Sequence, residues 1–471
     1  MFNILVLIYA IFYLILTQIR PVWALMLIIV ALPAYLIRFS LVGIPCTLLE
    51  LMIILSFGAW VVKILKDYKF DLKKYWREKR NRASYPFKLE IVALLLISYG
   101  AVFVAALSSS ALGIFKAYFL EPIIWFILVI NILGKEKKAS EKIIWSMLIS
   151  ALLVSAVAIY QKITGQFIFN EFWANEATRR AVSFFGYPNA VGLYLAPIVV
   201  IMISFLQQKL FSNSDNKTRK NILEIVIIAV AIILSLLSIY FAKSEGALAG
   251  IVAAVIFYGL LVNKKMRQVT LATLVIGLMF IVSPPKLLDY AKHKIILTNL
   301  SGQIRREQWI ETKKMLSSNY AWILGAGLSQ YPIKVLPYHQ EGIFVKNDDP
   351  NWLQKVRTSA AYRAQVWQPT EVYMYPHNIF LNFWTELGLL GMLLFTWIIG
   401  KYIYCAIKLF RSESRRKRVD RFVILGLGAA MVAILVHGLV DVPYFKNDLA
   451  VFFWLLVAFL GLYLVDYKNK E

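Results

Sequence analysis

Two histidine-containing segments and a set of basic residues carry the side chains that could do chemistry in this chain. His377 stands where a polar loop meets a membrane-spanning segment, in the run Tyr375-Pro376-His377-Asn378. Imidazole titrates near neutral pH and is the side chain most often used as a general base. Because Pro376 disfavours helical backbone before it, we expect the helix to start near Pro376 or His377, at the water–lipid boundary. A polar anchor at the headgroup level is the alternative interpretation of His377.

A second histidine, His437, is followed four residues later by Asp441, near the end of an apolar segment. On a helix, this spacing places both side chains on one face within reach of each other. The two residues are interpreted either as a second acid–base pair or as a structural hydrogen bond near the interface. Glu386 follows His377 by nine residues, which is about half a turn around the same helix and ~13 Å deeper. We therefore expect Glu386 to pair with a neighbouring helix in a structural role.

Basic residues stand at the predicted outer ends of several apolar segments, against the charge bias of membrane proteins. Arg180 precedes one such segment, Lys243 lies in a short turn, and Arg305 lies in a long loop. In the predicted helix 304–316, Arg305 falls on the packed stripe and Arg306 points elsewhere. The stripe consists of Arg305, Trp309, Thr312 and Leu316. Three cations converging near a histidine would bind a phosphate or pyrophosphate, whereas each alone is typical of a lipid-facing anchor.

The composition is that of a membrane protein. Hydrophobic residues make up 60% of the 471 residues and charged residues only 17%. Apolar runs recur at bilayer-spanning length, so the sequence predicts an all-α, polytopic helical membrane protein with about 12–13 transmembrane helices. We expect one integral membrane domain over 1–471, with a large, partly helical external loop at 284–376 packed on its outer face. The expected spans are roughly 2–18, 22–37, 46–66, 88–107, 112–133, 142–161, 187–207, 222–242, 246–262, 267–283, 377–406, 421–440 and 448–466.

The formal net charge of +24 comes mostly from short loops between apolar runs. This distribution is the positive-inside pattern, which explains the charge better than a nucleic-acid partner does. The longest segments on the opposite side, 162–186 and 284–376, are where a functional surface is expected. The basic loops that alternate correctly as cytoplasmic segments are 66–88, 135–142, 209–220, 263–267 and 408–421.

The sequence lacks the signals of a metal or cofactor protein. The two cysteines, Cys46 and Cys405, both fall inside predicted spans, so neither a disulfide framework nor a cysteine-based metal site is expected. No zinc, P-loop or dinucleotide motif occurs, and we predict no metal and no cofactor. The apolar N-terminus has no basic n-region and is interpreted as a retained span.

Four segments occur in a fixed order between Arg179 and Gly391, around the large loop. They cover 180–189, 243–247, 305–328 and 377–391. In the third segment, Arg305 stands four residues before Trp309 and is followed by the run Leu-Gly-Ala-Gly-Leu. The fourth segment begins with His-Asn and ends with Thr-Glu-Leu-Gly-Leu-Leu-Gly. Their order and spacing resemble the O-antigen ligase and O-antigen polymerase family of bacterial membrane glycosyltransferases, and the tail from His437 to Asp441 is also similar to that family.

The resemblance implies a metal-independent glycosyltransferase at the outer face of the bacterial cytoplasmic (inner) membrane. Such enzymes move a glycan from undecaprenyl pyrophosphate to an acceptor hydroxyl. The acceptor is the lipid A core oligosaccharide for a ligase, and a second lipid-linked glycan for a polymerase. By position, the resemblance gives the acceptor-activating role to His377 and the donor pyrophosphate to Arg180 and Arg305.

One departure from the family concerns the turn before residue 247. Members commonly show Ser-Arg-Gly where this chain has Ser244-Glu245-Gly246, so Lys243 is the candidate replacement for the missing arginine. A ligase is the first interpretation, and a polymerase of O-antigen or exopolysaccharide is the alternative. A transporter of polysaccharide or lipid-linked glycan is more distant, because the sequence shows no repeat of short, Gly/Pro-broken spans. A non-catalytic scaffold would leave the outer cations and His377 unexplained.

Overall fold

The fold is almost entirely helical in this computed structural model. The structure describes residues 2–41, 43–69, 71, 85–212, 219–282, 288–289, 293, 296–347, 349–415 and 420–468. Parts of several predicted segments therefore lie outside the described residues. They are the middle of the basic loops 66–88, 209–220 and 408–421, and the first residues of the loop 284–376. The last three residues of the chain also lie outside the described residues.

The described part of the N-terminal half consists mainly of helices. They are α1 (Phe2–Ile19), α2 (Pro21–Val30), α3 (Leu48–Asp67), α5 (Lys88–Val104), α6 (Ser109–Phe115), α7 (Glu121–Ile132), α8 (Ala139–Thr164), α9 (Glu171–Ala174) and α10 (Pro188–Ser212). A π-helical turn, Lys116–Leu120, joins α6 to α7. Local signals set the boundaries: Pro21 opens α2, and Thr47 and Glu50 form a capping box at the start of α3.

The C-terminal half contains longer helices and the loop that lies between two of them. Its helices are α11 (Arg219–Phe241), α12 (Glu245–Val262), α13 (Lys264–Val282), α15 (Leu300–Leu316), α16 (Ala321–Leu324), α17 (Tyr331–Val335), α18 (Trp352–Thr358), α19 (Ala360–Val366), α20 (Ile379–Arg415), α21 (Arg421–His437) and α22 (Asn447–Lys468).

Two short antiparallel strand pairs, which the sequence did not predict, complete the described fold. Strand β1 (Arg38–Leu41) pairs with β2 (Ile44–Thr47), and β3 (Gly342–Phe344) pairs with β4 (Trp367–Pro369). The second pair closes a segment that carries α18 and α19. Runs of three or four residues are too short to show a strand period, so their pairing depends on contacts made after the chain has folded.

The predicted spans appear as helices. Eight described helices are long and apolar enough to cross a membrane, and three shorter apolar helices lie at Ile4–Ile19, Pro21–Val30 and Arg421–His437. The two remaining predicted spans, 88–107 and 267–283, form α5 and α13. The polytopic helical membrane fold is therefore confirmed. The span predicted at 22–37 ends early as a regular helix, because the stretch around Pro33 turns into a 3₁₀ helix, Leu32–Leu36.

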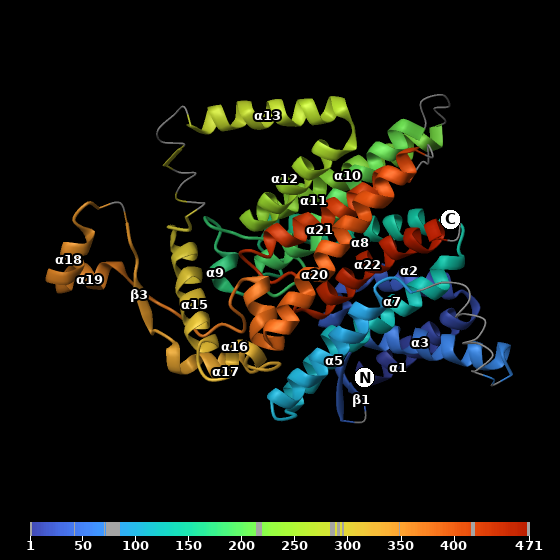
Figure 1. Cartoon of the computed structure of the whole chain (residues 1–471), viewed down its shortest axis with the longest axis horizontal. Coiled ribbons are helices and arrows are strands. Elements are labelled where there is room, and N and C mark those ends of the chain that lie inside the picture. The colour runs from blue at the N-terminus through green and yellow to red at the C-terminus, as the bar shows by residue number, and fades with distance from the viewer. Residues whose placement is uncertain are drawn as a thin grey trace.

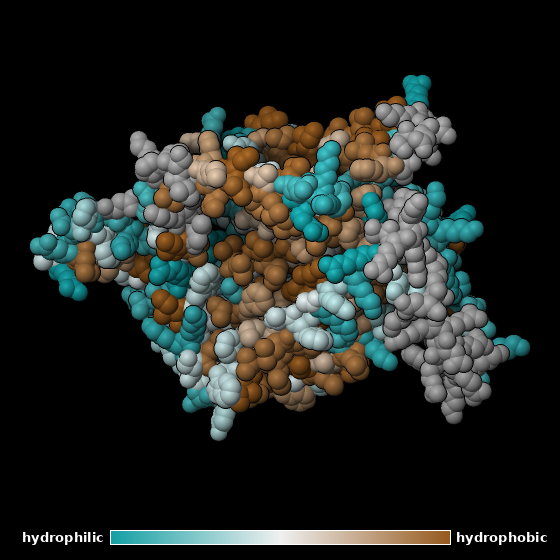
Figure 2. All heavy atoms as spheres, turned by 45° about the horizontal axis from the view of Figure 1, so that its top comes forward, coloured by the Kyte–Doolittle hydropathy of each residue, from teal (hydrophilic) through white to brown (hydrophobic). Residues whose placement is uncertain are grey.

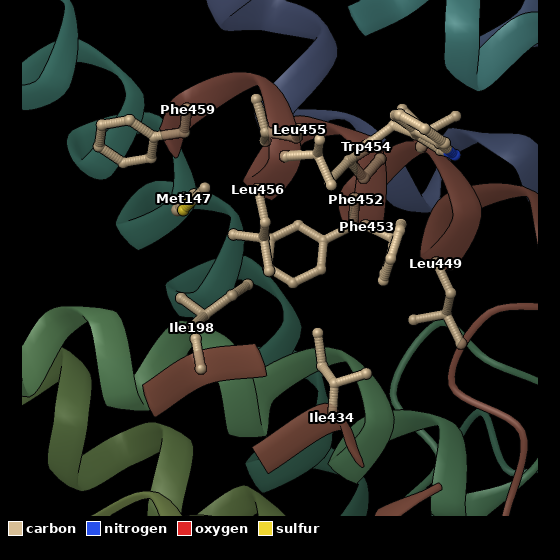
Figure 3. Close-up of a cluster of buried hydrophobic side chains, with 14 of the residues drawn as sticks. Met147, Ile198, Ile434, Leu449, Phe452, Phe453, Trp454, Leu455, Leu456 and Phe459 are labelled. Carbon is tan, nitrogen blue, oxygen red and sulfur yellow. The ribbon is translucent and has the colours of Figure 1, made fainter. Parts of the chain in front are cut away.

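The core is organised around α22, whose side chains are buried along most of the helix. Figure 3 shows Phe453, Trp454 and Leu456 of α22 among side chains contributed by other helices, such as Ile198 and Ile434. Helix α21 packs against α10, α12 and α20, and α22 packs against α7. The span-length windows of α10 and α22 are 83% and 78% buried, more than in the other described helices of that length, so these two helices occupy the interior.

The helix ends form two opposite polar surfaces. At one end, Lys209 Nζ of α10 lies 3.2 Å from a Glu141 carboxylate and 2.9 Å from a Glu224 carboxylate, and the adjacent Gln208 donates to Asp420 Oδ1 at 3.2 Å. The loop helices α15 to α19 lie at the other end, opposite the C-terminus (Figure 1). Between the two ends, brown hydrophobic side chains cover much of the visible surface (Figure 2).

Candidate functional site

Helix α15 packs against the segment that leads into α20, and its side chains Gln308 and Trp309 contact that segment. Arg305 is half-buried and Arg306 is exposed, which confirms the predicted orientation of the two arginines. Gln308, three residues after Arg305, is buried on the same side of the helix. Trp309 Nε1 donates a hydrogen bond to Pro376 O at 2.8 Å, so α15 is fixed against the segment that carries the candidate base.

His377 lies in a turn immediately before α20. Its φ of +43° is in the left-handed region. The helix begins at Ile379, so the prediction of a start near Pro376 or His377 is wrong. The reason is that Asn378 caps the helix: its side-chain oxygen accepts hydrogen bonds from two backbone N–H groups of the first turn, at 3.0 and 3.1 Å.

The imidazole of His377 has a fixed orientation. Its Nδ1 lies 3.0 Å from Gln308 Oε1, and the rings of Tyr373 and Tyr375 flank it at centroid distances of 5.1 Å each. An amide oxygen only accepts hydrogen bonds, so Nδ1 carries the proton and Nε2 presents its lone pair. In this tautomer, Nδ1 is held by Gln308 and Nε2 is free to accept a proton as a general base.

Charges from three parts of the chain meet near His377. Burial lowers the pKa of His377, Asp441 partly offsets this effect, and Arg305 adds to it. Burial also lowers the pKa of Arg180, and Arg305 lowers it further. Within the part of the chain that the structure describes, the Arg305 guanidinium makes no hydrogen bond or ion pair. A half-buried guanidinium in this state is suited to binding an anion.

Arg180 is held by backbone and side-chain acceptors. Its Nε donates to Ala242 O at 3.0 Å, and its NH2 group donates to Asn189 Oδ1 at 3.1 Å. The segment around it is fixed by Gln161, whose Oε1 accepts from the N–H groups of residues 182 and 183 at 3.0 and 2.6 Å. The guanidinium is thereby positioned beside the turn between α11 and α12.

That turn contains Lys243 and Glu245. Lys243 has a φ of +51°, and its Nζ donates to Thr178 O at 3.2 Å, so its ammonium group is directed at a carbonyl oxygen. Its own carbonyl accepts from Arg180 at 3.5 Å. Glu245, at the position where the resemblance suggests an arginine, is close enough to raise the pKa of Arg180, which burial lowers. This turn therefore brings a carboxylate, and not a second guanidinium, to Arg180.

Asp441 joins the site through Asn189. Asn189 Nδ2 donates to Asp441 Oδ2 at 3.1 Å, and the backbone N–H of Val442 donates to Asp441 Oδ1 at 2.8 Å. The expectation that His437 and Asp441 share a helix face is wrong, because α21 ends at His437. The turn that follows is hydrogen-bonded to the start of α20, because Gly438 O accepts from Ile379 N at 2.7 Å.

His437 is nevertheless near the other candidates. It is 3% exposed, and it interacts electrostatically with Asp441 and Arg305. A Cβ on Gly246 would lie 2.6 Å from His437 Cδ2, so only glycine at this position leaves room for the imidazole. The turn before α12 and the end of α21 thus pack directly on each other.

A half-buried cation that the sequence did not single out, Lys446, lies between α21 and α22. Its Nζ is 3.3 Å from Asp448 Oδ2 and 4.2 Å from the centre of the Phe185 ring. Burial lowers its pKa, whereas Asp448 and Asp441 raise it. The segment that carries Arg180 and Asn189 therefore packs against a lysine as well as against Asp441.

Glu386 belongs to a different contact. It is buried and accepts a hydrogen bond from Ser329 N at 2.7 Å, so its partner is a loop segment and not the neighbouring helix that was expected. Gly388 nearby has a φ of +74° inside α20, and a Cβ there would meet Ile323 O. A Cβ on Gly325 would lie 2.5 Å from Thr385 O. Two of the four family-like segments therefore pack against each other.

The structure brings most of the predicted site residues into one region. Electrostatic interactions connect His377, His437 and Arg180 with Arg305, and both histidines with Asp441. Lys243 is adjacent through its backbone. The sequence missed Gln308 and Asn189 as partners. The spacing of three residues between Arg305 and Gln308 on one helix was the signal that could have found Gln308.

These features define a polytopic membrane protein with a cationic site at one end of its helices. Residues 229–396 match the model of the O-antigen ligase family, Wzy_C, so this part of the chain is similar to that family. Members are membrane enzymes that transfer glycans, and the family implies lipid-linked glycan substrates. The match includes Lys243, Arg305 and His377, whereas Arg180 and Asp441 lie outside it. No curated protein matches the chain.

Proposed function

We propose that the chain is an O-antigen ligase-like glycosyltransferase that moves a glycan from undecaprenyl pyrophosphate to a hydroxyl of the lipid A core oligosaccharide. The observation that carries this proposal is the pairing of His377 Nδ1 with Gln308 Oε1 beside Arg305, whose guanidinium has no partner among the described residues. An oriented base next to an available cation is what transfer from an anionic leaving group requires.

His377 acts as the general base in this proposal. Its Nε2 takes the proton of the acceptor hydroxyl as the acceptor oxygen forms a bond to the anomeric carbon of the donor sugar. Direct attack inverts the configuration at that carbon. The lowered pKa of His377 keeps the imidazole neutral at pH 7, so its lone pair is available.

The basic residues stabilise the leaving group. As the bond between the anomeric carbon and the pyrophosphate oxygen breaks, the electron pair and its negative charge pass to the pyrophosphate. Arg305 and Arg180 are the guanidinium groups proposed to hold it, with Lys243 beside them, and no metal ion is required. Repulsion between the two arginines, expressed in the lowered pKa of Arg180, is relieved when a dianion binds between them.

The proposed location is the bacterial cytoplasmic membrane, with the site facing the periplasm. The charge pattern supports this orientation, because the basic loops and the candidate site alternate along the chain. The proposed partners are the lipid-linked donor, the lipid A core and the surrounding membrane lipid, without nucleic acid.

A transfer assay with purified protein tests this function. The protein is mixed with an undecaprenyl-pyrophosphate-linked oligosaccharide and EDTA, either with lipid A core acceptor or with excess donor alone. A lipid A conjugate is the expected product. A ladder of longer lipid-linked glycans would identify a polymerase instead, and requirement for a divalent cation would contradict the metal-independent mechanism. If neither product forms, flipping of a lipid-linked glycan in vesicles is the next measurement.

A further inference from the structure

A cavity of about 540 Å³ lies between α1, α2, α3 and α7, among residues that the transfer mechanism does not use. It is lined by Gln18 at the end of α1, by Trp60, Lys63 and Asp67 in the last turns of α3, and by Lys135 after α7. Lys63 and Asp67 lie where the basic loop 66–88 begins, and Lys135 lies where the loop 135–142 begins, on the side that the charge pattern assigns to the cytoplasm.

The inner wall of the cavity is formed mainly by apolar side chains, with Thr17, Ser56 and Asn131 as its buried polar residues. Ala24 and Leu25 are fully buried there. The two buried hydroxyl groups in the wall already have partners: Thr17 donates to Leu14 O at 2.6 Å, and Ser56 Oγ lies 2.9 Å from Tyr13 OH. Because both hydroxyl groups already form hydrogen bonds, they do not require a polar ligand. The wall can therefore pack against the hydrocarbon and glycerol carbons of a ligand.

The rim of the cavity is cationic. Lys63 and Lys135 are exposed, and among the described residues neither ammonium group forms a hydrogen bond or an ion pair. Lys142, on the same side of the molecule, instead pairs with Glu136 at 2.6 Å. Asp67 is the carboxylate among the lining residues, so the charged side chains of the cavity have a net charge of one positive unit. An anionic ligand is favoured over a neutral or cationic one.

The surroundings favour a lipid over a soluble anion. Apolar side chains next to the lining are strongly exposed, with Ile19 68% and Trp23 63% accessible. Trp60, half-buried in the lining, has the amphipathic ring that is enriched at the headgroup level. Basic pockets between transmembrane helices on the cytoplasmic side are typical binding places for anionic lipid headgroups.

We propose that this cavity binds the phosphoglycerol headgroup of an anionic phospholipid from the cytoplasmic leaflet. Lys63 and Lys135 contact the phosphate, and the upper acyl carbons lie against Leu25 and Trp60. The site is independent of glycan transfer and depends only on the orientation given by the basic loops.

Lipid binding to the purified, delipidated full chain tests the proposal by native mass spectrometry. The probes are dioleoyl phosphatidylglycerol, dioleoyl phosphatidylcholine and soluble sn-glycerol 1-phosphate. We expect the first to bind most tightly, and the double variant Lys63→Gln/Lys135→Gln to raise its Kd by about thirtyfold. The matched control is Lys66→Gln/Lys137→Gln, which removes the same charge from exposed positions outside the lining and should leave the Kd within about twofold.

Four outcomes would overturn the proposal. Equal weakening by both double variants would mean that general surface charge, and not the cavity, attracts the lipid. Equal binding of phosphatidylcholine would exclude recognition of an anion. Equal binding of sn-glycerol 1-phosphate would assign the site to a free phosphate ester. Ala59→Phe keeps both lysines and fills the cavity, so it should also abolish tight binding; unchanged binding would place the lipid elsewhere.

Discussion

Gln308 Oε1 lies 3.0 Å from Nδ1 of His377, across 69 residues of chain. This hydrogen bond fixes the tautomer in which Nε2 is the basic nitrogen. Gln308→Ala should therefore lower kcat about tenfold, the effect of losing one hydrogen bond of about 1.4 kcal/mol, with KM for the donor little changed. Steady-state transfer assays measure both. Gln308→Glu keeps an acceptor oxygen and should restore most of the rate; a fall in rate equal to that of the alanine variant would remove the orienting role.

His377→Ala should lower kcat by about 10²–10⁴-fold while the protein still inserts and folds, because the variant lacks the proposed base. Transfer rates and thermal unfolding in detergent measure the two properties. His339→Ala is the matched control: this imidazole lies in the same loop, where its Nδ1 is 3.3 Å from a Glu311 carboxylate. Full transfer by the His377 variant would exclude it from the mechanism.

The pH profile of transfer should report the charges around His377. The base is active when neutral, so kcat falls as pH drops through its pKa, which burial lowers below the ordinary value of 6.5. Arg305→Gln removes a positive neighbour that lowers this pKa, so the acidic limb should move to higher pH, and KM for the donor should rise. Arg306→Gln, on the exposed side of α15, should change neither. Equal effects of the two substitutions would contradict the helix orientation.

Glu386 should act through its hydrogen bond and not through its charge. Glu386→Gln keeps an oxygen for the Ser329 N–H, so stability and transfer should be close to those of the parent chain. Glu386→Ala leaves a partly buried N–H without its acceptor and should lower the free energy of unfolding by about 1–3 kcal/mol. Thermal unfolding of the three proteins provides the comparison. A glutamine variant as damaged as the alanine variant would show that the carboxylate itself is needed.

Gly388 should be the glycine of α20 that tolerates substitution least. Its φ of +74° and the adjacent Ile323 carbonyl leave no room for a Cβ, so Gly388→Ala should cost at least about 1–3 kcal/mol of stability. Gly400→Ala on the same helix faces open space and should be neutral or stabilising. The difference in melting temperature between the two variants measures the effect, and similar values would argue against the close packing of α16 on α20.

The sequence was sufficient for the features that depend on local composition and period. Run length and hydrophobicity predicted the helical membrane fold, because a bilayer-spanning helix must be long and apolar. The helical period alone placed Arg305 on the packed side of α15 and Arg306 on the exposed side. The order of the basic and apolar segments also predicted that the outer cations and His377 share one side, and the structure brings Arg180, Arg305 and His377 into one region.

Tertiary structure decided what lies next to what. Helix α21 ends at His437, and the turn that follows accepts a hydrogen bond from the start of α20. Asp441 lies beyond this turn and meets Asn189 and not a helix neighbour. The partner of Glu386 is likewise a loop backbone that is distant in the chain. Local periodicity fixes which face of a helix is buried. The side chain that meets that face comes from a segment tens or hundreds of residues away, and only the packing of the whole chain selects it.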